Sequence, residues 1–212
     1  KKEIIVSDGN STDGTIDIIK KYTDKLVIHS GEKRQNISQG RNAGAKIAQG
    51  DYFVFMDADT SLSDADVFFA KAISLFEKNP KLGALTVKIK VLPEFETFGD
   101  KIIFGFMNLM HRFYNNTCGT GVSTGEFQMM RREVFDSVGG FNESFAAGED
   151  YDMFNRISKK YSTKMDPSIT VYHTGRRAHT IGWPRLLSQW FMNFFYTTFF
   201  KKSASDTWEE VR

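Results

Sequence analysis

Residues 51–61, DYFVFMDADTS, decide the fold of this chain. Five apolar residues at 52–56 are followed by Asp57 and Asp59, which lie one residue apart. An unbroken apolar run of this length is typical of a strand that is buried on both faces of a sheet. Two carboxylates at the end of such a strand serve two chemistries. They hold a divalent metal against a diphosphate, or the first attacks a phosphate while the second transfers a proton.

The remaining pattern predicts an α/β fold with a Rossmann-type, mostly parallel sheet and helices on both faces, because strands and helices alternate up to residue 91. Strands are predicted at 3–7, 26–29, 52–57, 83–91 and 169–173, and the alternating pattern of 83–91 indicates a half-exposed strand. Helices are predicted at 11–22, 36–50, 63–79, 97–116, 148–161 and 183–200, while 123–141 reads as strand, short helix and turn.

Composition bounds the class of protein. The 212 residues suffice for one core, so we expect a single domain over 1–212. Net charge is only +2, and we expect no nucleic-acid partner. The single cysteine, Cys118, excludes an intrachain disulfide and a cysteine-rich zinc site, which fits a reducing compartment and a cytoplasmic location. No apolar run is long enough to predict a transmembrane helix.

Polar residues stand at the ends of three predicted strands. The first strand leads into Asp8, the third into Asp57 and Asp59, and the last ends in His173. In such a sheet these strand ends meet at one crevice, where ligands bind. Carboxylates with an imidazole suit Mn²⁺ or Mg²⁺, with phosphate oxygens completing the shell. The alternative for the aspartates is an ordinary turn after a strand, where Asp is favoured.

Two further segments suggest chemistry. Arg41 lies near the start of a helix rich in Ala and Gly, where it can meet a diphosphate; the alternative is a solvated arginine. Glu149 and Asp150 begin another helix, whose dipole stabilises them as anions. One of these carboxylates can accept a proton from an attacking hydroxyl, although acid pairs at helix starts are common.

Three blocks together resemble the family-2 glycosyltransferases with a GT-A fold: VSDGNSTDGT (6–15), GRNAGAKIAQGDYFVFMDADT (40–60) and RREVFDSVGGFNESFAAGEDYDMFNRI (131–157). The resemblance covers residues 3–175 and the blocks keep the family's order. It implies a nucleotide-diphosphate sugar donor, a divalent metal and a glycan or lipid-linked acceptor. On the donor side, the resemblance implies that Asp8 contacts the nucleotide base, Arg41 the nucleotide base or the diphosphate, and Asp57 the ribose or a metal-bound water. It implies that Asp59 ligates the metal and that His173 makes a third metal contact. Asp150 is the implied general base, Glu149 binds the acceptor, and Gly125 and Glu126 line the sugar pocket.

The resemblance implies a single displacement with inversion, in which Asp150 takes the acceptor proton. It divides the chain into a nucleotide-sugar half at 1–91, an acceptor and catalytic half at 92–180, and an aromatic helix and tail at 181–212. The family normally opens with one more strand and helix before the first block. This sequence begins at what should be the second strand, so we expect that unit to be missing from it.

Two other functions are weighed against transfer. A phosphatase of the haloacid-dehalogenase type would use Asp57 as nucleophile and Asp59 as acid and base, but it leaves the first two blocks unexplained. A non-catalytic module that binds sugar nucleotides or membranes would bind without turnover. Binding of a nucleoside diphosphate with Mn²⁺, followed by turnover, separates these possibilities.

The C-terminal helix at 183–200 bears on the acceptor. Eight of its eighteen residues are aromatic, and Lys201 and Lys202 follow. There is no Asp or Glu between Pro167 and Ser205, so this region is locally basic. Aromatics with cations suit peripheral attachment to the cytoplasmic face of a membrane. The equal alternative is that the helix packs on the core or forms a homodimer interface.

Overall fold

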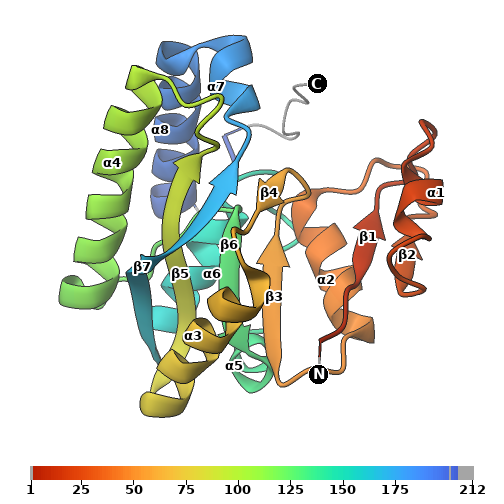
Figure 1. Ribbon diagram of the computed structural model, residues 1–212, viewed down its shortest axis with the longest axis horizontal. Helices are drawn as coiled ribbons and strands as arrows, with labels where there is room; N and C mark the ends of the chain where they lie inside the picture. Colours follow the sequence, from red (N-terminus) through yellow and green to blue (C-terminus); the bar gives the residue numbers. More distant parts are fainter. Residues whose placement is uncertain (1, 201, 205–212) are drawn as a thin grey trace.

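A computed structural model describes residues 2–200 and 202–204, and the predicted tail at 201 and 205–212 lies outside that description. The main sheet has five strands in the order β3-β6-β5-β7-β4 (Figure 1). A separate parallel pair, β1-β2, stands to one side with helix α1. The strands are β1 Val6–Asp8, β2 Leu26–Ile28, β3 Tyr52–Met56, β4 Thr60–Ser61, β5 Leu82–Val91, β6 Phe127–Arg131 and β7 Ser162–His173.

The α/β class is confirmed, but the sheet is mixed rather than mostly parallel. In the main sheet only β5 and β7 pair in parallel, while β6 runs antiparallel to both β3 and β5 and β4 runs antiparallel to β7. Parallel strands need a crossover between them, and the regular alternation that predicted one ends at residue 91. Strand β6 enters the middle of the sheet from the loop that follows the π-helix η1.

The predicted helices are present, with shifted bounds. They are α1 Thr15–Ile19, α2 Ile37–Ile47, α3 Ala65–Lys78, α4 Phe98–Phe113, α5 Arg132–Ser137, α6 Glu149–Ser158, α7 Arg176–Ile181 and α8 Trp183–Phe200, with η1 at Tyr114–Cys118. Asn36 and Thr97 begin α2 and α4 with capping boxes that fix where these helices start. The predicted 11–22 helix shortens to one turn and a half, and neither α7 nor β4 was predicted.

Two hydrophobic clusters confirm that helices cover both faces of the sheet. On one face, Phe68, Ala72 and Phe76 of α3 pack with β5 and β7. On the other, Met153 and Phe154 of α6 pack with α5 and with the side chains of β3 and β6 that point that way. The prediction that 83–91 is half-exposed is wrong, because α3 and α6 bury the two faces of β5.

Helix α2 connects the small sheet to the large one. Gly44 of α2 lies against Ile5 just before β1, whereas Ala45 and Ala48 pack beside Phe53 of β3. Strands β1 and β3 do not pair with each other, and each is at the end of its own sheet. The Arg41 side chain therefore sits on an element that both sheets position.

Asn108 takes the place of a strand neighbour for part of β5. Its side-chain amide donates to the carbonyl of Ile89 at 2.8 Å, and its oxygen accepts the Ile89 N–H at 3.0 Å. Both groups are buried, so removing the amide leaves a backbone donor and acceptor without partners.

We expect Asn108→Ala to lower the free energy of unfolding by about 2–4 kcal/mol, because two buried backbone groups lose their partners. Urea denaturation followed by circular dichroism measures the change. The matched control is Leu109→Ala, one residue along on the exposed face of α4, which should cost under about 1 kcal/mol. Equal losses in the two variants would contradict the role of Asn108.

Candidate active site

Arg41 gathers four segments that are distant in the sequence. Its guanidinium donates to Asp57 at the end of β3 (3.1 Å), to Glu149 at the start of α6 (3.0 Å) and to the carbonyl of Gly125 before β6 (3.3 Å). The same group lies 5.3 Å from the centre of the Phe141 ring. Arg41 and Asp57 are thus in direct contact, and the hydrogen bond to Glu149 adds the start of α6 to the same cluster.

The sequence of α2 explains how Arg41 reaches this position. Asn42, its neighbour, donates to the carbonyl of Phe141 (2.9 Å) and accepts the Phe141 N–H (2.9 Å). Asn36 also donates to the carbonyl of Glu143. These bonds fix α2 against the loop that leads into α6, so Arg41 faces the start of that helix.

The charges around Arg41 are strongly unbalanced. Burial acts to lower the pKa of Arg41, but Glu149, Asp57 and Asp150 together raise it, so the guanidinium stays charged. Five carboxyl groups influence one another here, namely Asp57, Asp59, Glu126, Glu149 and Asp150. Carboxylates crowded in this way favour the binding of protons or of a cation.

Glu149 and Asp150 occupy the first turn of α6, as predicted from the sequence. Gly148 begins this helix in a left-handed conformation, and a Cβ there would lie 2.6 Å from the Thr197 hydroxyl oxygen of α8. Burial raises the pKa of both carboxyls, and for Glu149 the neighbouring Asp150 raises it further, whereas Arg41 opposes the rise in both. A carboxyl with a raised pKa is suited to accept a proton near neutral pH.

Asp57 and Asp59 point toward different partners because the chain turns between them. The Thr60 N–H and hydroxyl both donate to the Asp57 carbonyl, which closes the turn. Asp59 receives a hydrogen bond from Thr174 (3.2 Å) and lies 3.5 Å from the Arg176 guanidinium. Residues 57–60 therefore form a turn, which was the alternative interpretation of the two aspartates. Their carboxylates also form separate ion pairs, Asp57 with Arg41 and Asp59 with Arg176.

His173 lies beside this turn, since Thr60 pairs with it across β4 and β7. Burial lowers the pKa of the imidazole despite the nearby Asp59, so the ring is neutral at pH 7. Its Nδ1 accepts the Gly175 N–H at 3.2 Å, while Nε2 is buried without a hydrogen-bond partner. Across residues 2–200 and 202–204, no three His, Cys, Asp or Glu side chains form a ready metal cluster, so Asp57, Asp59 and His173 are not a preformed three-ligand set.

Asp8 organises the loop that follows β1 rather than pointing outward. Its carboxylate accepts the N–H groups of Asn10 (2.9 Å) and Ser11 (2.7 Å) and the Ser11 hydroxyl. The loop lines a cavity of about 400 Å³ whose other wall is formed by residues 34–37 and Gly40 at the start of α2. Asp8 therefore shapes a polar cavity next to the helix that carries Arg41.

Gly125 and Glu126 complete the cluster from the loop before β6. A Cβ at Gly125 would come 2.8 Å from the Arg41 guanidinium and 3.1 Å from the Asp57 carboxylate, so only glycine allows this approach. Burial, with Asp57 adding to it, raises the pKa of Glu126 to about 7, and its Oε2 is buried without a hydrogen-bond partner. A buried carboxyl oxygen without a partner is unusual and makes the neutral, protonated form of Glu126 the favoured one.

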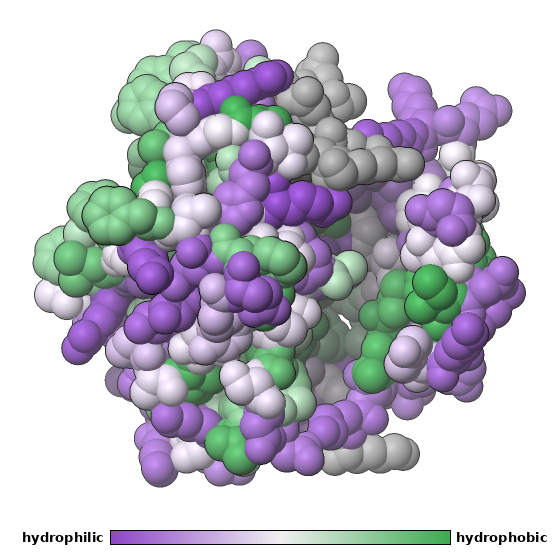
Figure 2. All heavy atoms as spheres, turned by 45° about the horizontal axis from the view of Figure 1, so that its top comes forward, coloured by the Kyte–Doolittle hydropathy of each residue, from purple (hydrophilic) through white to green (hydrophobic). Residues whose placement is uncertain are grey.

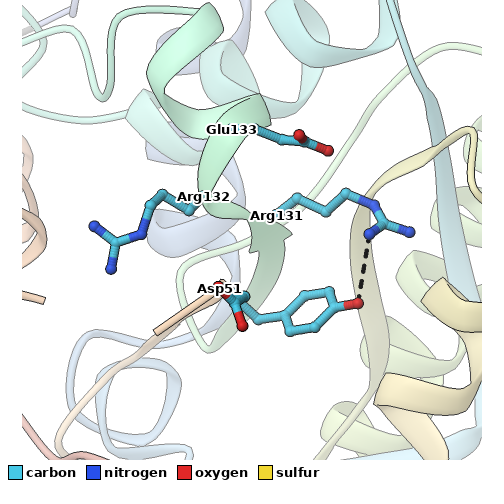
Figure 3. A pocket seen from close by; sticks show the side chains of 5 residues that line it. Asp51, Arg131, Arg132 and Glu133 are labelled. Carbon is cyan, nitrogen blue, oxygen red and sulfur yellow. Dashed lines mark hydrogen bonds between the residues drawn. The ribbon is translucent and has the colours of Figure 1, made fainter. Parts of the chain in front are cut away.

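A second cavity, of about 250 Å³, lies at the opposite end of β3 and has a structural explanation. Figure 3 shows Arg131 and Arg132 extending to opposite sides of β6, with Arg131 bonded to the Tyr52 hydroxyl (3.4 Å). Arg131 also donates to the carbonyls of Leu82 and Phe76, and Arg132 to those of Gly50 and Ala48. Both guanidinium groups therefore have a structural role, because they donate hydrogen bonds to backbone carbonyls.

Sequence reasoning missed the partners of Asp59. Arg176 belongs to the basic region between Pro167 and Ser205. Its helix, α7, is too short to give a periodic signal in the sequence. The sequence analysis also did not predict the Phe141 ring over Arg41, although Gly139, Gly140 and Phe141 precede Glu149 and Asp150 in the same block.

Comparisons with known proteins identify a family and a fold. The family model described as glycosyl transferase family 2 matches residues 1–139. The succinoglycan biosynthesis protein ExoA of Rhizobium meliloti is 24% identical over 85% of this chain and 56% of its own length. The β-monoglucosyldiacylglycerol synthase of Nostoc sp. is 27% identical over 89% of this chain, which spans 44% of that protein.

A solved structure has the same fold. The Pyrobaculum calidifontis mannosyltransferase in complex with GDP-Man and Mn²⁺ aligns with a TM-score of 0.69 at 22% identity, over 92% of this chain and 54% of that one. The chain spans about half the length of these known proteins.

The raised pKa of Glu126 gives a test of the cluster in metal-free protein. Glu126 binds a proton in the folded state up to about pH 7 but only to about pH 4.5 when unfolded, so its contribution to stability falls as pH rises through that window. Glutamine imitates the neutral form. At pH 5 we expect Glu126→Gln to match the wild type, and at pH 8 to be more stable by on the order of 2 kcal/mol, or about 5 °C in Tm.

Differential scanning calorimetry in EDTA at several pH values measures this difference. Glu133→Gln, on the exposed start of α5, is the control and should show no pH-dependent gain. A difference between Glu126→Gln and the wild type that stays constant from pH 5 to pH 8 would exclude the buried, proton-binding state of Glu126.

Proposed function

Because the chain belongs to glycosyl transferase family 2, we propose that it transfers a sugar from a nucleotide-diphosphate sugar to an acceptor hydroxyl, with a divalent metal and with inversion. The observation that carries the proposal is the Arg41 cluster. One buried guanidinium joins Asp57 of the proposed donor site to Glu149, the neighbour of the proposed base. Donor and acceptor groups are thereby held within one site.

The donor is proposed to lie between the β1 loop and the end of β3. The cavity behind Asp8 offers backbone and side-chain polar groups for a nucleoside, and it borders Gly40, next to Arg41. The diphosphate would extend toward Asp57 and Asp59, where Arg41 and Arg176 supply positive charge. Residues 1–91 would form the donor half and 92–180 the acceptor half.

A divalent metal fits the residues at the end of β3. Asp59 would ligate it, with Asp57 in or near its water shell, and the remaining positions would belong to donor phosphates, as Mg²⁺ and Mn²⁺ accept. His173 would contribute its buried Nε2, which requires the imidazole to carry its proton on Nδ1 and to give up the Gly175 hydrogen bond. Bound metal would stabilise the negative charge that develops on the departing diphosphate.

The chemical step is proposed as one in-line displacement. The acceptor oxygen forms a bond to the anomeric carbon as the bond from that carbon to the diphosphate oxygen breaks. Asp150 takes the acceptor proton, and the electron pair of the broken bond leaves with the nucleoside diphosphate. Glu149, held by Arg41, would position the acceptor, while Gly125 and Glu126 would line the sugar pocket. Attack from the face opposite the leaving group inverts the configuration.

The raised pKa of Asp150 favours a hydroxyl acceptor. A hydroxyl needs a base to remove its proton, whereas an ionised phosphate needs none and would be repelled by the carboxylates around it. The acceptor is proposed to be a glycan or a lipid-linked molecule, handled at the cytoplasmic face of a membrane. The Nostoc relative is named for synthesis of a glycolipid, which is in keeping with a lipid-linked acceptor.

The two other functions now have less support. A phosphatase would need Asp57 as a free nucleophile, but its Oδ1 is 3.1 Å from the Arg41 guanidinium, and the family of this chain is one of transferases. A binding module without turnover would have no use for a buried carboxyl poised to take a proton.

We expect Asp150→Asn to reduce kcat by a factor of about 10²–10⁴, because the amide cannot accept the acceptor proton. Nucleoside diphosphate binding should be unchanged. Asp152→Asn is the control. Asp152 lies two residues after Asp150 on the same helix, and its carboxylate pairs with Arg156 at 2.7 Å. Release of UDP or GDP from a panel of donor sugars measures turnover, and full activity of Asp150→Asn would disprove the assignment of the base.

We expect UDP or GDP to bind more tightly with Mn²⁺ than in EDTA, and Asp59→Ala to remove most of this gain. Isothermal titration calorimetry with each nucleotide measures it. Asp66→Ala, an exposed aspartate paired with Lys2, should behave as the wild type. If the Mn²⁺ effect persists in Asp59→Ala, another group holds the metal.

A further inference from the structure

Helix α8 buries polar side chains and exposes aromatic ones. Its buried residues are Leu186, Asn193 and Thr197. Five phenylalanines lie on its exposed side, at Phe191, Phe194, Phe195, Phe199 and Phe200, and Phe191 and Phe199 are 66% and 68% exposed. A helix at the surface of a protein in water normally turns its apolar stripe toward the core. On α8, Leu186, Trp183 and Trp190 do face the core, but the phenylalanines remain exposed.

Helix α4 turns an apolar stripe outward more completely. Three of its four buried residues, Asp100, Asn108 and His111, are polar. Its exposed residues form an apolar stripe at helical spacing, consisting of Phe98, Ile102, Phe106, Leu109 and Phe113, with Phe98 78% exposed. The inward contacts of Asp100 and Asn108 fix this orientation, because each side chain is held by two or more hydrogen bonds.

The two helices meet near their starts, on the inner side of α4. Trp183, the first residue of α8, donates to Asp100 of α4 at 3.1 Å, and its ring lies 5.4 Å from that of Phe104. In Figure 1 α4 and α8 are both drawn at the end of the sheet where β5 and β7 lie, with α8 further back. In Figure 2 hydrophobic side chains project along the margin of the molecule where Figure 1 places α4.

The charges on these helices are all of one sign at the surface. Lys101 and Arg112 of α4 and Arg185 of α8 are exposed, and Lys202 follows α8. The only acidic residue in either helix is the fully buried Asp100. Lys101 has an acidic neighbour, Glu96, which lies just before α4. An apolar face bordered by cations complements an anionic lipid surface, into which aromatic side chains insert while cations meet the headgroups.

We propose that the α4–α8 face, made of the exposed sides of these two helices, docks the protein on an anionic lipid bilayer. The helices would lie in the interfacial layer rather than cross it. Among the described residues, no helix is long and apolar enough to span a membrane. Both helices contribute, so the surface is wider than the C-terminal helix alone.

This docking would place the bilayer next to the proposed acceptor site. Near its end α8 contacts the start of α6, where the Phe194 ring is 5.1 Å from that of Tyr151 and Thr197 abuts Gly148. Asp150 is therefore adjacent to a helix whose outer side faces lipid. A lipid-linked hydroxyl could reach the base from the membrane surface. This last step rests on the proposed function, whereas vesicle binding does not.

Vesicle flotation tests the proposal, with phosphatidylcholine vesicles that contain or lack phosphatidylglycerol. We expect the wild type to float with the anionic vesicles and to be released by salt. Phe106→Glu on α4 and Phe191→Glu on α8 should each weaken vesicle binding by about tenfold or more, because each removes apolar contact and adds a repelled charge. Val67→Glu, at a similarly exposed apolar position on α3, is the matched control and should bind as the wild type does.

Two results would overturn the proposal. One is that the wild type binds neither kind of vesicle but forms a dimer by light scattering, which Phe106→Glu or Phe191→Glu dissociates; the face would then join two copies of the chain. The other is that Val67→Glu loses vesicle binding as much as the α4 and α8 variants do. Mn²⁺-dependent UDP or GDP binding by the same variants should be unchanged, so failure of lipid docking is distinguishable from failure of the proposed function.

Discussion

The buried guanidinium of Arg41 is the interaction on which the rest of the site depends. It joins the end of β3, the strand that follows α2, to the loop before β6 and the start of α6, which are about a hundred residues away in the sequence. Burying a charge away from water is unfavourable unless the charge is well paired. Removing one partner of a buried ion pair leaves the other charge buried and unpaired, which is strongly destabilising. Arg41 therefore sets both where the carboxylates stand and how strongly they repel one another. The two helix-to-loop bonds of Asn42 are needed because the guanidinium must arrive at a fixed point.

Burial raises the pKa values of Glu126, Glu149 and Asp150, and neighbouring carboxylates raise them further, because one arginine does not neutralise five carboxyl groups. Packing such a cluster weakens the fold, since the same positions filled with neutral side chains would repel less. Sites retain costs of this kind where the charges serve binding or catalysis. The imbalance is relieved by protons, by a metal or by a cationic group of a substrate. Protons and a metal are both components of the proposed sugar transfer, in which a proton is taken and a diphosphate leaves.

Much of this arrangement could be predicted from the sequence, because strand ends and helix starts are local features. Asp57, Glu149 and Asp150 lie at such positions, as predicted. The apolar run before Asp57 correctly indicated a strand, but the expectation that it is buried on both faces is wrong, because β3 is at the end of its sheet and only Phe53 of its five residues is buried. The direction of β6 could not be predicted, since it depends on contacts with β3 and β5 that are far apart in the chain. The oxygens of Asp8 accept hydrogen bonds within its own turn, which the local sequence leaves open, and its contact with a nucleotide base stays a prediction. Arg176 was missed because it acts through a short helix that has no periodic signal.

Amphipathic helices have a further ambiguity that sequence alone does not resolve. A pattern of apolar and polar residues in α4 and α8 shows that the helix has two faces, but not which one points inward. In α4, hydrogen bonds decide which face of the helix points inward. Asn108 satisfies the backbone of Ile89, and Asp100 accepts bonds from Trp183 and His179. Those polar contacts hold the apolar stripes outward, where water would disfavour them. Two adjacent helices with this arrangement make sense when the outer medium is itself apolar, because then both faces of each helix have suitable surroundings.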